Sequence, residues 1–274
     1  MYSRVYVEIT NLCNMHCSFC HGHSRAPRRM TAEEFSHILS ELSEVTSYLY
    51  YHLMGEPLTH PELPLFLQMA HERGFRSVIT TNGTLLAKRK TELLSAPLYK
   101  VNLSVHSFEE GSKEEFYRYL GELSDFAEEA SGQGTIVVFR LWNRGFDDGR
   151  NEAILAFLQE RFSGEWAENT RGMRIRDKLH IDWGDRFAWP DIEADEGSNE
   201  VFCYALGDHF GILADGSVVP CCLDSDGQLF LGNIFEMPIS RILSSSRAES
   251  IREGFSRRCA TESLCRRCGY ARKF

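Results

Sequence analysis

Three cysteines near the start of the chain stand in a C-x3-C-x2-C spacing, at Cys13, Cys17 and Cys20. Thiolates at such short intervals on one loop favour a metal centre. A closed zinc site needs a fourth protein ligand, whereas a [4Fe–4S] cube takes one ligand per iron and would here leave one iron open to an outside chelator. The spacing therefore predicts either an open iron–sulfur cluster or zinc completed by one of three histidines: His16, His21 or His23.

The other six cysteines all follow residue 200, and none lies between Cys20 and the first of them. Four could act together, two of them in a C-x2-C pair: Cys203, Cys221, Cys265 and Cys268. Four thiolates can fully ligate one auxiliary [4Fe–4S] cluster, but their spacing alone also allows a zinc ribbon. Cys222 and Cys259 are either alternative ligands or packed thiols. Packing is favoured for Cys222, because neighbouring residues of a strand point to opposite faces.

Composition sets the context for these thiols. The chain has 274 residues, of which 43% are hydrophobic and 25% charged, as in a globular protein. No apolar run is long enough for a membrane helix and no signal peptide opens the chain, so a cytoplasmic location is expected. With 30 basic and 39 acidic residues the net charge is −9, which disfavours general nucleic-acid binding. An exception is the segment 256–274, where six basic residues oppose only Glu262.

Hydrophobic periodicity predicts six strands separated by five helices. The strands are expected at 4–10, 47–53, 76–81, 99–105, 135–142 and 178–183, and the helices at 31–45, 61–74, 84–95, 112–131 and 151–162. This order predicts an α/β fold, a parallel sheet curled into an open (β/α)6 partial barrel, with its chemistry beyond the carboxyl ends of the strands. After it, 209–220 reads as a hairpin around Asp215-Gly216, and 239–255 as helical.

The first cysteine set resembles the signature of the radical SAM superfamily, in which an aromatic residue precedes the last cysteine, as Phe19 does. The resemblance implies a SAM-binding [4Fe–4S] cluster whose open iron is chelated by S-adenosylmethionine. It further implies that reductive cleavage of this cofactor gives a 5′-deoxyadenosyl radical, which abstracts hydrogen from a substrate. A reductant such as flavodoxin or ferredoxin is then an expected partner.

Further motifs support this resemblance over most of residues 1–183. Met54-Gly55-Glu56-Pro57 is similar to the family's turn that binds the methionine amine, with Met54 in place of its first glycine, and TTNG at 80–83 is similar to its third-strand turn. The cofactor-binding residues that the resemblance implies are Phe19, Gly55, Glu56, Pro57, Asn82, Ser104 and Arg140. For Arg140, a charged residue in an apolar run, a salt bridge to a barrel acid is the alternative to the cofactor's carboxylate.

The second cysteine set resembles the shortened SPASM, or twitch, appendage of radical SAM dehydrogenases, most closely that of the aminocyclitol dehydrogenase of butirosin biosynthesis. The expected organisation is a core at 1–188, an acidic linker at 189–202 and an auxiliary cluster domain at 203–274. The nearby arginines fit either a negatively charged cluster or an acidic partner.

An auxiliary cluster favours a two-electron oxidation of a small polar molecule, because it can accept the second electron. Candidate bases for the accompanying proton are His106, Tyr204 and Asp182, with Asp224 a further possibility, and spacing distinguishes none of them. The alternatives are modification of a peptide or protein, as in radical SAM maturases, and a non-enzymatic iron–sulfur or zinc protein.

Overall fold

Strands and helices alternate along the first two thirds of the chain, as the sequence periodicity predicts. The computed structural model describes residues 1–146 and 149–273. They divide into two compact units, each built from separated segments of the chain. The first holds Met1–Asn14, His21–Arg76 and the residues from Phe187 onward, and the second holds Met15–Cys20 and Ser77–Arg186.

In the first unit, β1 (Arg4–Val7) lies between two parallel neighbours, β2 (Tyr48–Tyr50) and β9 (His209–Ile212). The antiparallel strands β10 (Ser217–Val219) and β11 (Gly232–Asn233) follow at the edge. The predicted hairpin is thus confirmed, and Gly216 supplies the positive φ of its turn, at 85°. The C-terminal hairpin therefore extends the sheet that the first strand begins.

Five helices belong to the first unit: α1 (Ala32–Leu42), α2 (Leu63–Glu72), α6 (Ile239–Leu243), α7 (Ser246–Ser256) and α8 (Ser263–Arg266). The Thr31 side chain and Glu34 form a reciprocal capping box at the start of α1. The helical pattern at 239–255 proves to be two helices. The Ser245 hydroxyl accepts a hydrogen bond from the Ala248 N–H and so starts a second helix.

In the second unit, four strands run parallel in the order β3 (Arg76–Thr81, of which Arg76 belongs to the first unit), β4 (Leu98–Ser104), β5 (Ile136–Arg144) and β8 (Leu179–Asp185). The antiparallel pair β7 (Gly172–Arg176) and β6 (Ala167–Asn169) continues from β8. The sequence prediction omitted this pair because β6 is fully exposed and shows no apolar alternation.

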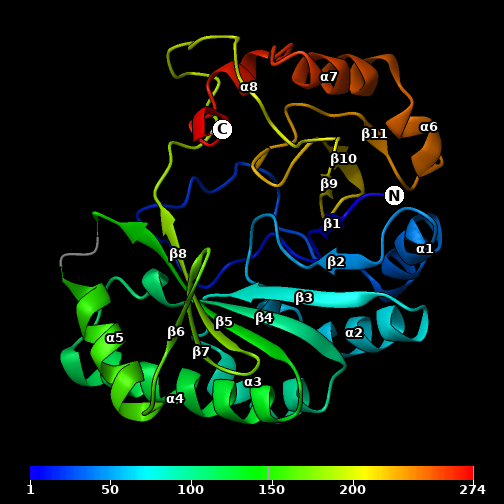
Figure 1. Ribbon diagram of the computed structural model, residues 1–274. Coiled ribbons are helices and arrows are strands. Elements are labelled where there is room, and N and C mark those ends of the chain that lie inside the picture. Colours follow the sequence, from blue (N-terminus) through cyan, green and yellow to red (C-terminus); the bar gives the residue numbers. More distant parts are fainter. Residues whose placement is uncertain (147–148, 274) are drawn as a thin grey trace. The chain divides into compact units, whose positions relative to one another are not determined.

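The strands of the second unit have two faces that differ in chemistry. One face is apolar and buried, with Val101, Leu103, Val137, Phe139 and Ile181 at most 1% exposed. Helices α3 (Leu86–Leu94), α4 (Lys113–Gly132) and α5 (Arg150–Arg161) lie along one side of these strands (Figure 1). Strand alternation directs the intervening residues to the opposite face, which carries Lys100, Asn102, Ser104, Arg140 and Asp182.

The sheet is mostly parallel and does not close into a barrel, so the predicted α/β class with an open arrangement of strands is confirmed. All six predicted strands and all five predicted helices are present, with ends shifted by a few residues. Among the described residues, no helix combines the length and the apolar character that crossing a membrane requires.

Candidate functional site

The N-terminal thiols lie on an accessible loop after β1. Cys13 and Cys20 are exposed and Cys17 is partly buried. Cys13 belongs to the first compact unit, whereas Cys17 and Cys20 belong to the second. The Cys20 N–H donates to the Cys17 carbonyl at 3.0 Å, which closes a tight turn, and the Cys17 thiol lies 3.8 Å from the Ser107 carbonyl. Thiols with this accessibility can be reached by an exogenous ligand.

Phe19 anchors this turn on the second unit. Its ring packs against the His106 ring with centroids 4.8 Å apart, and the Arg186 guanidinium lies 5.6 Å from its centroid. Arg186 also pairs at 3.4 Å with Glu109, whose carboxylate accepts hydrogen bonds from the backbone and hydroxyl of Ser18. The short segment that carries Cys17 and Cys20 is therefore held on both sides of Phe19.

The Gly55-Glu56-Pro57 turn after β2 is tightly fitted within the first unit. Gly55 has a φ of 74°, and a Cβ there would stand 2.3 Å from the Thr10 carbonyl oxygen, so only glycine fits. The Glu56 N–H donates to the Leu12 carbonyl at 2.8 Å, directly before Cys13. The buried Glu56 carboxylate accepts from the Leu58 N–H at 3.0 Å, which caps the short 3₁₀ helix Pro57–Thr59. Met54, which replaces the family's first glycine, is buried.

A buried ion pair that sequence analysis missed supports this turn. Glu8 on β1 is fully buried, and both of its oxygens bind the Arg25 guanidinium at 2.7 Å. The same carboxylate accepts hydrogen bonds from the backbone N–H groups of Met54 and Ala214, each at 3.1 Å. One carboxylate thus joins the Met54 turn to the C-terminal hairpin. Glu8 could have been found from the sequence, because it is a charged residue within a strand pattern, the same feature that identified Arg140.

On the polar face of the second unit, register places Ser104, Arg140 and Asp182 side by side on β4, β5 and β8. The Arg140 guanidinium lies 4.5 Å from the centroid of the Trp142 ring. Asp182 is buried and pairs at 3.2 Å with Arg171, from the β6–β7 turn. The structure therefore brings together three of the residues predicted for the site, and it adds a cation that the sequence did not single out.

His106 and Asn82 are committed to local contacts. His106 follows β4 in a 3₁₀ turn, and its Nδ1 lies 3.0 Å from the Arg140 carbonyl. Burial lowers the pKa of this imidazole to about 4, so the ring is neutral at pH 7. The Asn82 side-chain oxygen accepts from both the backbone and the hydroxyl of Thr84, which stabilises the turn after β3.

The four C-terminal thiols occupy one region of the first unit. Cys203, Cys221 and Cys265 are partly buried and Cys268 is buried. Burial raises the pKa of Cys221 well above its usual value, and the thiols of Cys222, Cys203 and Cys265 raise it further. The pKa of Cys265 is raised by burial and then by Cys203 and Cys268. Four neighbouring thiols can supply the donor set that a [4Fe–4S] cluster requires, and coordination would remove their protons.

The described residues contain no group of three or more His, Cys, Asp or Glu side chains already gathered to hold one metal ion.

The two remaining C-terminal cysteines are Cys222, which also interacts with the thiols of Cys221 and Cys203, and Cys259. Cys222 packs with Tyr6 against the buried residues Leu53, Leu213 and Val219, as expected for a packed thiol. Its pKa is raised to about 11 by burial, although a hydrogen bond with the Tyr6 side chain lowers it in part. The Cys259 sulfur accepts a hydrogen bond from the Asn199 side chain at 3.7 Å.

The acidic segment before Cys203 is docked on the cluster region rather than free. Arg266 and Arg267 both pair with Glu196, and the Gly197 N–H donates to the Arg266 carbonyl at 3.2 Å. Arg267 also donates to the Ala194 carbonyl at 2.7 Å. These two arginines of the basic C-terminal segment therefore already have an acidic partner inside the chain.

Two further candidate bases differ in accessibility. The Tyr204 side chain is exposed, at 47%. Asp224 is buried, and its two oxygens accept from the backbone N–H groups of Gln228 and Leu229 at 2.9 and 2.8 Å. Its surroundings are those of a loop-stabilising carboxylate.

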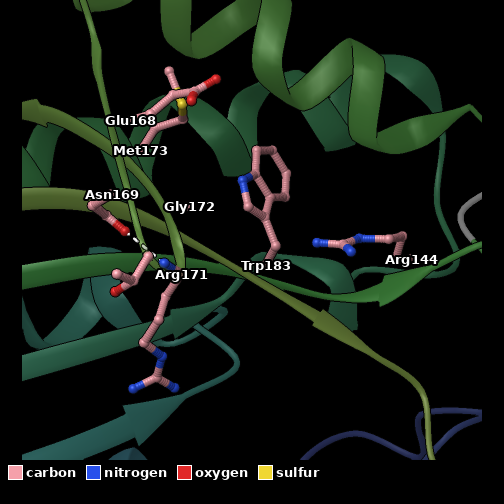
Figure 2. Close-up of a pocket in the computed structure, with 8 residues that line it drawn as sticks. Arg144, Glu168, Asn169, Arg171, Gly172, Met173 and Trp183 are labelled. Carbon is pink, nitrogen blue, oxygen red and sulfur yellow. Dashed lines mark hydrogen bonds between the residues drawn. The ribbon is translucent and has the colours of Figure 1, made fainter.

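A separate pocket of about 390 Å³ opens near the β6–β7 turn (Figure 2). None of the residues predicted for the site lines it; its lining is Arg144, Glu168, Asn169, Thr170, Arg171, Gly172, Met173 and Trp183. In Figure 2 the Arg144 guanidinium points toward Trp183, whereas the Arg171 side chain extends away from both. Arg171 is thus directed to the Asp182 side of β8.

Comparison with known proteins places these two cysteine regions in established families. Residues 7–128 match the Radical SAM superfamily, and residues 203–269 match SPASM, an iron–sulfur cluster-binding domain. Both matches include the cysteines predicted to bind clusters in their regions. The two domains imply a SAM-binding [4Fe–4S] cluster, S-adenosylmethionine and auxiliary iron–sulfur ligation, which favours iron over the zinc alternatives.

Two relatives share parts of the sequence. The chain is 32% identical over 117 residues to a probable GTP 3′,8-cyclase of Methanothermobacter marburgensis, a match covering 42% of this chain and 37% of the relative. It is 31% identical over 111 residues to the PqqA peptide cyclase of Bradyrhizobium diazoefficiens, covering 39% and 29%. The chain thus matches only about a third of the length of these relatives.

The fold is similar to that of a solved structure along nearly its whole length. The crystal structure of BtrN in complex with AdoMet and 2-DOIA superposes with a TM-score of 0.62 and 21% identity, covering 98% of this chain and 93% of that one. The similarity to BtrN concerns the fold, whereas the two family matches show that the chain contains a radical SAM domain and a SPASM iron–sulfur cluster-binding domain.

Proposed function

We propose that this enzyme removes a hydrogen atom, an electron and a proton from a small polar substrate, a two-electron oxidation of the dehydrogenase type. The observation that carries the proposal is the C-terminal set of four interacting thiols, Cys203, Cys221, Cys265 and Cys268. Four protein ligands leave no iron of a cubane open to substrate, so the set suits electron transfer rather than substrate binding.

Cys13, Cys17 and Cys20 would hold the N-terminal cluster and leave its fourth iron to the cofactor. When bound, these groups supply a 5′-deoxyadenosyl radical for hydrogen abstraction, and the auxiliary cluster supplies an acceptor for the second electron. A reductant such as flavodoxin or ferredoxin would deliver the first electron. The role of the chain is to orient the cofactor and the substrate around these groups.

The residues proposed to bind S-adenosylmethionine fall into two sets. In the first unit, Gly55, Glu56 and Pro57 form a rigid turn whose backbone is fixed against Thr10 and Leu12, which suits recognition of the methionine amine. In the second unit, Ser104 and Arg140 share a row on the polar face and are proposed to bind the cofactor's carboxylate. Phe19 and Asn82 would support the cluster loop and the third-strand turn.

Among the candidate bases, Asp182 has the surroundings most suited to accepting the substrate proton. It lies in the row of Ser104 and Arg140, and its carboxylate pairs with Arg171 at 3.2 Å. His106 is a weak base, because its pKa is lowered to about 4. Tyr204 is exposed and lies next to a proposed cluster ligand, so its role would depend on substrate approaching that side.

The test is a Cys265→Ala/Cys268→Ala variant, reconstituted anaerobically and reduced in the presence of S-adenosylmethionine. We expect 5′-deoxyadenosine to form, while the product 2 Da lighter than the substrate is lost from the mass spectrum. Iron should fall from eight to about four atoms per chain if each cluster holds four irons. Product formation that survives in this variant would rule out the proposed role of the auxiliary thiols.

Cys259→Ala is the matched control, because the Cys259 sulfur accepts a hydrogen bond from the Asn199 side chain and Cys259 is not one of the four proposed ligands. This variant should retain eight irons and oxidised product. An unchanged iron content in both variants would contradict the assignment of Cys265 and Cys268 as ligands.

Modification of a peptide is the second candidate, favoured by the similarity to a PqqA peptide cyclase. The two candidates differ in the substrate that raises the yield of 5′-deoxyadenosine. If deuterium passes into 5′-deoxyadenosine from labelled peptides but not from labelled small polyols or nucleotides, the peptide candidate replaces the first.

A further inference from the structure

Lys100 on β4 is a partly buried cation, and the carboxylate that acts on it, Asp182, is already paired with Arg171. It lies on the polar face of the second unit, two residues before Asn102 and four before Ser104, and it is only partly exposed. No carboxylate of residues 1–146 or 149–273 lies within ion-pair distance of its ammonium group. Burial and the nearby Arg140 guanidinium lower the pKa of Lys100. Its positive charge therefore destabilises the folded protein.

The charges around Lys100 are unequally matched. Four cations face this region, namely Lys100, Arg140, Arg171 and Arg174, against the two carboxylates of Asp177 and Asp182. Asp182 is already paired with Arg171 at 3.2 Å, and Asp177 is exposed. Under the proposed function Arg140 is reserved for the cofactor. Lys100 then remains as a partly buried cation on this face. The exposed Arg174 lies opposite His180 on the neighbouring strands.

A buried acceptor lies on the same strand face as Lys100. Asn102 is fully buried, and its amide nitrogen donates to the Thr80 hydroxyl at 3.1 Å and, more weakly, to the Ile79 carbonyl at 3.4 Å. Its side-chain oxygen has no hydrogen-bond partner among the described residues. A buried carbonyl oxygen without a hydrogen-bond donor destabilises the folded protein unless a bound molecule supplies that donor.

We infer that Lys100 and Asn102 form the specificity site for an anionic substrate, one that carries a phosphate or carboxylate group near a hydrogen-bond donor. Lys100 would bind the anion and the Asn102 oxygen would accept from the donor. This inference rests on the proposed function and narrows its substrate class. It explains why a lysine without an ion-pair partner is kept on the polar face of the sheet, where an apolar residue would cost less to bury.

The experiment is isothermal titration calorimetry on the anaerobically reconstituted enzyme with S-adenosylmethionine present. Inorganic pyrophosphate and succinate are titrated separately, so that the two sources of anionic charge are distinguished. We expect at least one to bind, with an affinity that falls as sodium chloride rises. Lys100→Met should weaken that binding by about 10-fold or more, the loss of one charge-assisted contact, and Lys100→Arg should recover most of it.

Lys88→Met is the matched control, because Lys88 is an exposed lysine on α3. It should bind the same anion with unchanged affinity. Failure of both anions to bind, or equal affinity in the Lys100→Met and Lys88→Met variants, would overturn the inference. Absence of 5′-deoxyadenosine from the unmodified enzyme would instead contradict the proposed function, so the two failures are distinguishable.

Discussion

The two cysteine regions use the same side chain in different surroundings. In the N-terminal loop, Cys13 and Cys20 are exposed, and the loop is held mainly through its backbone and Phe19. In the C-terminal region the four thiols are partly or fully buried and interact with one another, and the segment before them is tied down by Arg266 and Arg267. Exposure suits a site that must admit an outside ligand, and burial suits a site that is closed.

The difference gives the largest expected effect when the N-terminal set is broken. Cys17→Ala removes one of the three proposed ligands of the N-terminal cluster, so the cluster should not assemble. We expect 5′-deoxyadenosine formation to fall below detection, whereas about four irons per chain should remain in the auxiliary site. Iron quantitation and chromatography of the reaction measure both. Retained cofactor cleavage would show that the N-terminal set is not the catalytic one.

The Glu8–Arg25 pair supplies the next largest effect, because it links the segment after the N-terminal cysteines to the C-terminal hairpin within one unit. Arg25→Met leaves the buried Glu8 carboxylate without its cation and should destabilise the chain by about 3–5 kcal/mol. Urea denaturation followed by circular dichroism measures this loss.

Arg257→Met is the control for that measurement, because the Arg257–Glu253 pair is exposed at both ends, with 72% and 71% of the side chains accessible. Exposed pairs contribute little, so the urea midpoint should not move. A comparable loss in the two variants would mean that burial of Glu8 is not the source of the effect.

Sequence reasoning located much of this architecture because its signals are local. The spacing of Cys13, Cys17 and Cys20 and the strand periodicity through Arg140 are each contained in a short window. The capping box at Thr31 and the Asp215-Gly216 turn are equally local, and the structure contains both. These features depend on backbone preferences that a few neighbouring residues determine.

The features that sequence reasoning missed depend on partners far apart in the chain. Glu8 meets Ala214 across 206 positions, and Arg171 reaches Asp182 through a hairpin whose outer strand has no apolar pattern. The docking of Glu196 on Arg266 likewise could not be inferred from an acidic run that reads as a solvated linker. Charge alone shows that such residues need partners, but only the fold determines which ones they find.

Each of the two compact units also contains a largely buried histidine, and these histidines predict that stability depends on acid pH. Burial lowers the pKa of His106 in the second unit and of His209 in the first from 6.5 to about 4. As the pH falls from 6.5 to 4, these histidines therefore become protonated in the unfolded chain but stay neutral in the folded chain. Stability is complete above pH 6.5 and is lost through that window, by up to about 3 kcal/mol for each histidine.

Urea titrations between pH 7 and 4 measure this loss, and His106→Phe and His209→Phe separate the two contributions. Each variant should show a shallower fall in the urea midpoint than the unmodified chain. A slope that neither substitution changes would assign the acid sensitivity to other groups.

The smallest expected effect concerns the tether of the acidic segment to the auxiliary region. Glu196→Gln removes the charge that pairs with Arg266 and Arg267, but the Glu196 carboxylate itself is exposed to solvent, and ion pairs that solvent reaches contribute little to global stability. The thermal midpoint should therefore stay unchanged. Limited proteolysis should nevertheless cut the segment 189–202 faster, because its local opening becomes easier while the thiol region stays folded.

Glu193→Gln is the matched control, since Glu193 is exposed in the same segment and has no ion pair among the described residues. If both variants are cut at the rate of the unmodified chain, the two arginines do not hold the segment, and its attachment depends on the backbone hydrogen bonds of Gly197 and Ala260 instead.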